Sequence, residues 1–226
     1  KKWKPNNLNY REQLAEHYDR TGQAPEAFAE RLELAEICFD KGLSGEALAH
    51  IRATLDRTDV ERPRRMEIAA LLADRDCPAQ AVAEYENVAR QAFENDDLDQ
   101  AEEACRTGLE VARDHPPLHE VLLQVSLERR PDQALELCER LVELYRAQGK
   151  PDRAVRVLEQ VKQRLADRPE PGILLARLSA EIDHPDTAIA ELKQVAGREI
   201  SPQQMDEALR IADAVAQRHE DRLDRA

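Results

Sequence analysis

The chain has 226 residues and a formal net charge of −13 at pH 7, and aromatic residues make up only 4% of it. Nucleic-acid-binding domains usually carry a basic footprint, so this acidic balance argues against a nucleic-acid partner and favours a basic protein partner or a plainly solvated surface. The four cysteines show no CxxC or CxxH spacing, which argues against a zinc site and predicts reduced thiols in a cytoplasmic compartment.

An alanine recurs at regular intervals along the whole sequence. Successive members are separated by 20, 34, 20, 33, 20, 34 and 20 residues, and they are Ala27, Ala47, Ala81, Ala101, Ala134, Ala154, Ala188 and Ala208. The longer period of 53 or 54 residues is typical of a repeat architecture. A helix with its short connection takes roughly 17–20 residues, so each period is predicted to hold three helices.

Four units of three helices fit the chain, and we expect them at 8–57, 62–113, 117–167 and 171–222. In chain order the predicted helices are 8–21, 25–40, 45–57, 62–74, 79–94, 98–113, 117–129, 132–148, 152–167, 171–182, 186–198 and 203–222. Prolines mark many of the expected starts, where a missing N–H costs nothing. Glycines mark several expected ends, where a left-handed cap residue is favoured; they are Gly22, Gly42 and Gly149.

Each recurring alanine leaves room for a neighbouring helix to approach closely. The apolar residues that follow one of them, Val157, Leu158 and Val161 after Ala154, form the i, i+3, i+4, i+7 stripe of an amphipathic helix. One unit cannot bury such stripes alone, whereas stacked units can, so the pattern predicts a solenoid.

The stretch LVELYRAQGKPDRAVRVLEQV, residues 141–161, resembles a tetratricopeptide repeat (TPR). The matching positions are Leu141, Val142, Tyr145, Gly149, Ala154, Leu158 and Val161, and residues 14–34 and 88–108 follow a similar pattern. The chain departs from the family because its spacing alternates between 20 and 34. The resemblance implies a single all-α, right-handed superhelical solenoid of about twelve antiparallel helices, with atypical three-helix units of about 54 residues.

The family resemblance also implies a binding surface, because the first helix of each motif usually lines a concave groove. Carried over by motif position, the groove residues are Glu136, Glu139, Glu143 and Arg146, together with Glu12, Glu16, Asp19, Glu36, Phe39 and Asp40. This mostly acidic set favours a basic or amphipathic peptide. The other interpretation, which we prefer for an acidic protein with acid on every face, is an exposed face whose charge only keeps the solenoid in solution.

Signals for catalysis are weak. His115 and His119 have the i, i+4 spacing of a metal pair, but Pro116 and Pro117 lie between them, so they flank a helix start. HExxH, GxSxG and phosphate-loop motifs do not occur, and serine is scarce. We therefore expect no enzyme activity, no catalytic residue, no metal site and no cofactor.

The sequence also bears on the setting of the chain. No run approaches the ~18 apolar residues of a membrane span, and the start KKWKPNNLNY has neither an initiator methionine nor a signal-peptide core. We expect a piece of a longer protein, and the abundance of alanine, arginine and aspartate suggests a bacterial, GC-rich genome.

The predicted function is a non-catalytic protein–protein interaction scaffold that binds a peptide or helix of a partner, with a basic segment favoured. One alternative is a regulatory arm that packs on other domains of a larger signalling or enzyme protein. Another is an assembly protein that associates with itself through its end helices. The sequence leaves the choice between a monomer and a weak dimer open.

Overall fold

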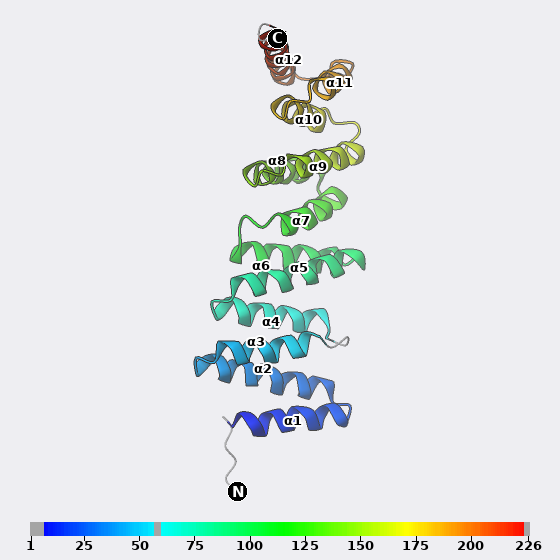
Figure 1. Ribbon diagram of the computed structural model, residues 1–226. Coiled ribbons are helices and arrows are strands. Elements are labelled where there is room, and N and C mark those ends of the chain that lie inside the picture. The colour runs from blue at the N-terminus through cyan, green and yellow to red at the C-terminus, as the bar shows by residue number, and fades with distance from the viewer. Residues whose placement is uncertain (1–6, 57–59, 224–226) are drawn as a thin grey trace. The chain divides into compact units, whose positions relative to one another are not determined.

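The computed structural model describes residues 7–56 and 60–223, with side chains up to residue 218. Within these ranges the chain forms helices and no strands (Figure 1). The twelve helices of the described chain are α1 (Leu8–Arg20), α2 (Ala24–Asp40), α3 (Ser44–Leu55), α4 (Arg62–Asp74), α5 (Pro78–Glu94), α6 (Leu98–Val111), α7 (Pro116–Arg129), α8 (Pro131–Ala147), α9 (Pro151–Arg164), α10 (Glu170–Glu181), α11 (Pro185–Ala196) and α12 (Pro202–Leu223).

The helices fall into two compact bodies, Lys1–Arg113 and Asp114–Ala226. The first body contains α1 to α6, and the second contains α7 to α12. Within each body, most consecutive helices pack beside one another. The predicted all-α class and stacked helical repeats are confirmed, while one continuous right-handed superhelix over the whole chain stays a prediction.

Helix starts agree closely with the predicted ones, and helix ends agree less well. The helix expected at 98–113 ends at Val111, because Ala112 is already extended (φ −138°, ψ 92°) ahead of Pro116. The helix expected at 152–167 ends at Arg164, ahead of Pro169. A proline disfavours helical backbone in the residue before it and leaves a helix before it little room to continue. The predicted end of the third helix, residue 57, lies outside the described residues.

Six of the turns share one backbone geometry, in which a residue just past the helix end has positive φ. Gly22, Gly42 and Gly149 adopt it as predicted, with φ between 66° and 74°. The next amide then donates to the carbonyl five residues earlier, as Gln23 does to Tyr18 (2.9 Å), which is the Schellman arrangement. The other three turns use aspartate at this place, and the sequence analysis missed them; they are Asp76, Asp96 and Asp183.

Seven of the eight recurring alanines are fully buried, with at most 1% of their surface exposed; they are Ala27, Ala47, Ala81, Ala101, Ala134, Ala154 and Ala188. The exception is Ala208 in α12, which is only half-buried. The predicted role of these alanines as close contact points therefore holds along the chain until the last helix.

The second and third helices of a unit are covered by the first helix of the next unit. In the first body, Ile68 and Leu72 of α4 join Phe28 and Ile51 of α2 and α3 in one apolar cluster. The guanidinium of Arg64 in α4 also lies 5.0 Å from the centre of the Phe28 ring. In the second body, α10 contributes residues to the cluster formed by α8 and α9; they are Leu174, Leu175 and Leu178.

Candidate functional site

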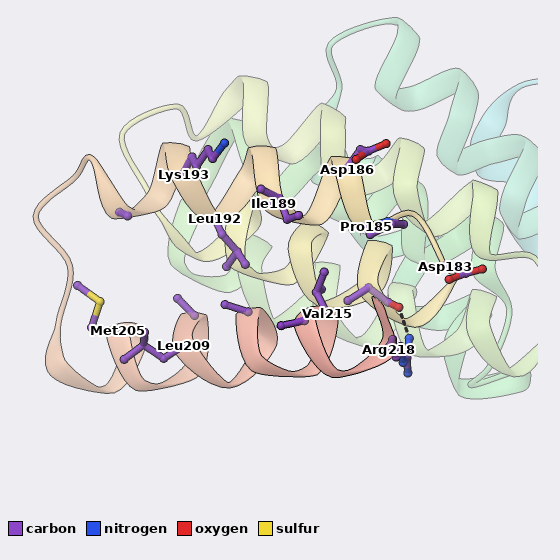
Figure 2. Close-up of a pocket in the computed structure, with 15 residues that line it drawn as sticks. Asp183, Pro185, Asp186, Ile189, Leu192, Lys193, Met205, Leu209, Val215 and Arg218 are labelled. Carbon is purple, nitrogen blue, oxygen red and sulfur yellow. Dashed lines mark hydrogen bonds between the residues drawn. The ribbon is translucent and has the colours of Figure 1, made fainter. Parts of the chain in front are cut away.

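An apolar groove runs between α11 and α12, with a volume of about 870 Å³ (Figure 2). Figure 2 shows Leu192 of α11 and Val215 of α12 pointing into the groove from its two sides. On the α12 side, small residues recur every four positions as Ala208, Ala212 and Ala216 and so share one helix face. These alanines leave open space beside the larger apolar side chains of the groove.

Three large apolar side chains at this groove are exposed. Ile189 is 40% exposed, Met205 is 41% exposed and Leu209 is 55% exposed. They are three of the five large hydrophobic residues that are exposed in the described chain; the other two, Tyr10 and Leu43, belong to the first body. Clustered exposed apolar residues mark interaction sites, whereas scattered single ones do not.

The internal repeat shows why the groove is open. By the 53–54-residue period, Ala212 of α12 corresponds to Leu158 of α9 and Ile51 of α3. Leu158 is 0% exposed and Ile51 is 4% exposed, because their clusters include residues of α10 and α4. Ala212 is exposed, and no helix of the described residues covers it in the same way. The α11–α12 groove is therefore the face that a further helix covers in the earlier units.

Polar contacts place α12 as a true third helix of its unit. The Arg62–Asp97 ion pair (3.3 Å) joins α4 to α6, and the Gln204–Glu170 hydrogen bond (3.2 Å) joins α12 to α10. The two contacts have equivalent places, since Arg62 and Glu170 are each the first residue of their helix and residue 97 corresponds to 204 by the repeat. Since the same positions connect the same helices, the groove is built on the regular repeat.

Charges of both signs surround the groove. Asp183 and Asp186 lie near the N-terminal end of α11, and Lys193 lies near its C-terminal end. Arg218 of α12 donates a hydrogen bond to the backbone carbonyl of Ala180, drawn as a dashed line in Figure 2. The rim therefore offers two acidic and two basic groups around an apolar centre.

The residues expected to line a concave groove lie in both bodies. Glu12, Glu16 and Asp19 belong to α1, Glu36, Phe39 and Asp40 to α2, and Glu136, Glu139, Glu143 and Arg146 to α8. On α8 the three glutamates are exposed, and their spacing places them on one face of the helix. The structure thus brings these three together.

Several of the other expected residues take part in ion pairs within the chain. Asp19 pairs with Arg31, and Asp40 pairs with Arg75, whose guanidinium also lies 6.0 Å from the centre of the Phe39 ring. Arg146 pairs with Glu181 of α10 at 2.7 Å. These contacts hold neighbouring helices together, so a ligand would have to compete for the same charged groups.

Buried side chains that carry reactive groups are held in their neutral forms. Burial raises the pKa of the Cys105 and Cys138 thiols to about 12, so they are protonated near neutral pH. Burial, and then the hydrogen bond to Glu120, raises the pKa of Tyr145 to about 12. In the described part of the chain, no group of three or more His, Cys, Asp or Glu side chains is arranged to hold a metal ion. No described helix is long and apolar enough to cross a membrane.

Comparison with known proteins found solved structures that are similar to this chain. No protein-family model matches the sequence, and the search of curated proteins found no match. Similar solved structures include a putative kinesin light chain of Podospora anserina with nearly identical TPR-like repeats (21% identity, 97% of this chain, 92% of that chain, TM-score 0.34). A thermophilic TPR protein of Thermus thermophilus is another (18% identity, 69% of this chain, 100% of that chain, TM-score 0.29).

A third similar structure is the C-terminal part of a TPR repeat-containing protein of Cytophaga hutchinsonii (14% identity, 89% of this chain, 88% of that chain, TM-score 0.32). The chain is TPR-like in fold. At these low TM-scores the likeness adds nothing about function, and the fold rests on the helix packing described above. Residues 141–161 have the helix–turn–helix architecture that the TPR resemblance implies, since they form the end of α8, a turn at Gly149 and the start of α9.

Proposed function

We propose that this TPR-like chain is a non-catalytic protein–protein interaction module whose α11–α12 groove receives a helix of a protein partner. The observation that carries the proposal is the cluster of exposed Ile189, Met205 and Leu209 around a groove of about 870 Å³. Helix-in-groove recognition places the apolar face of an amphipathic helix into such a surface. Since α4 and α10 cover the corresponding faces of earlier units, a helix is the fitting occupant.

The covering helix α10 indicates the chemistry that the groove would accept. It presents Leu174, Leu175 and Leu178 to α8 and α9, which is the i, i+1, i+4 pattern of an apolar helix face. The small residues Ala208, Ala212 and Ala216 would let the backbone of a docked helix approach closely. The expected ligand is therefore an amphipathic helix with closely spaced leucines or isoleucines.

A synthetic peptide of residues 169–183, which contains α10, serves as a defined probe for the groove. We expect saturable binding to the intact chain by fluorescence anisotropy, and a loss of affinity of at least about tenfold in Leu209→Glu, because the substitution places a charge at the centre of an apolar contact. Leu43→Glu is the matched control, since Leu43 is also exposed but lies in the first body. Absence of binding to the parent chain, or equal affinity for Leu209→Glu, contradicts the proposal.

The exposed acidic face of α8 supports a second contact, with a basic segment of a partner. Glu136, Glu139 and Glu143 lie exposed on one face, and the chain as a whole carries a charge of −13. In affinity capture from a lysate of the source organism, we expect a basic partner that is lost at high salt, because salt screens exposed charges. The folded triple variant Glu136→Lys, Glu139→Lys, Glu143→Lys should also lose it. A partner that both proteins retain places the contact on another face.

Two further features concern the cellular compartment and the source organism of the module. All four cysteines are free thiols, which supports a reducing, cytoplasmic compartment. The bacterial origin that the composition suggests remains part of this proposal. The regulatory-arm alternative is the case in which the docked helix belongs to another domain of a larger signalling or enzyme protein.

A further inference from the structure

We propose that the helix received by the α11–α12 groove belongs to a second copy of this chain, so that two α11 helices pack antiparallel across a twofold axis near Ile189. This inference rests on the proposed function, because it takes the groove to be a helix-docking site. It adds the identity of the partner and the geometry of the complex. The support comes from the charge pattern of α11, the balance of charges around the groove and the dimensions of the groove.

The exposed face of α11 carries a self-complementary pattern. Asp186, Ile189 and Lys193 lie at i, i+3 and i+7, so they share one face, and all three are exposed. The two charges are seven residues apart, about 10.5 Å along the helix, with Ile189 between them. A twofold interface uses the same patch on both copies. Antiparallel pairing about Ile189 therefore places Asp186 of each copy beside Lys193 of the other.

The local charge balance favours this partner over a strongly basic one. The chain carries −13 in total, which opposes self-association by general repulsion. Around the groove, however, the rim charges cancel, since Asp183 and Asp186 are matched by Lys193 and Arg218. A neutral, alternating rim around an apolar centre suits a copy of itself.

The groove has the dimensions to hold α11 of a second copy. With 12 residues α11 is about 18 Å long, and with 22 residues α12 is about 33 Å long. The second copy's α11 can therefore lie along α12 over its whole length, against the small side chains of Ala208, Ala212 and Ala216.

Sedimentation equilibrium of the full chain between about 1 and 300 µM tests the inference. We expect the mass to rise from 25.7 kDa toward twice that value, and Ile189→Glu to hold the chain at the monomer mass. Leu43→Glu, the same kind of change at an exposed leucine in the first body, should leave the equilibrium unchanged. The substitution Asp186→Lys or Lys193→Asp alone should raise the dimer dissociation constant about tenfold or more, because both symmetric pairs become repulsive.

The double variant Asp186→Lys, Lys193→Asp provides the decisive control, because it restores opposite charges across the twofold axis. We expect it to recover most of the parent affinity even if α11 itself is slightly destabilised. A parent chain that is monomeric throughout, or a dimer that the single charge changes do not weaken, overturns the inference. If that monomer still binds the 169–183 peptide through Leu209, the second copy is rejected as partner while the docking site stands. If the peptide also fails to bind, both proposals fall.

Discussion

Leu158→Ala is expected to lower the free energy of unfolding of the second body by about 2–5 kcal/mol. Leu158 is 0% exposed and packs in a cluster formed by α8, α9 and α10. Truncation removes buried methyl groups and leaves a cavity that stacked helices fill only partly. Urea denaturation followed by circular dichroism measures the change as a shift of the unfolding midpoint.

The matched control for this prediction is Leu209→Ala, the same substitution in the same body. Leu209 is 55% exposed at the α11–α12 groove, so at concentrations where the chain is monomeric its truncation should change stability by less than about 0.5 kcal/mol. Comparable losses at the two sites would mean that Leu209 is buried in solution. That result would remove the groove as an open surface in the monomer.

Ala154→Leu and Ala101→Leu are each expected to cost about 1–3 kcal/mol. Both alanines are 0% exposed, and the added side chain would push apart helices that approach closely there. Ala212→Leu in α12 is the comparison, because this alanine is exposed in the groove. Guanidinium denaturation should show lower midpoints for the first two variants only. Unchanged midpoints for both buried sites would show that the recurring alanines are not the contact points of the repeat.

The order and positions of the helices could be predicted from the sequence because the residues that start and end each helix lie at its own boundaries. Prolines preset the first helical turn, and Gly22, Gly42 and Gly149 end helices in the left-handed conformation. The turns at Asp76, Asp96 and Asp183 were missed, since aspartate tolerates this conformation but is also common within and around helices. The regular steps of the alanine repeat still spanned these turns, so the missing caps did not disturb the order of helices.

The residues that line a binding surface were harder to predict than the helices, because the role of a charged side chain depends on contacts between distant residues. Arg31 occupies a position where the family pattern expects an apolar residue, and the structure shows that it pairs with Asp19, twelve residues away. The partners of Asp40 and Arg146 are each 35 residues distant. A pattern of residue types on one helix carries no information about such pairs. Asp19, Asp40 and Arg146 were therefore assigned to a ligand-binding surface.

The α11–α12 groove was missed, although the repeat contained a signal for it. Every recurring alanine was expected to contact a neighbouring helix, and Ala208 is the last of them. By the repeat period, Ala212 of the last unit corresponds to the larger Leu158 and Ile51 of earlier units. Ile189 corresponds to Phe28, so this position stays apolar. Only the structure shows that Ile189 is exposed while Phe28 is buried, because exposure depends on whether another helix follows in space.

The central claim is that the α11–α12 groove docks a helix, and methyl NMR tests it most directly. The chain has two methionines: Met205 lines the groove, and Met66 packs against the α2–α4 cluster of the first body. With ¹³C-labelled methionine methyl groups, titration with the 169–183 peptide should shift or broaden the Met205 signal and leave the Met66 signal in place. A Met205 signal that stays unchanged at saturating peptide would contradict the claim.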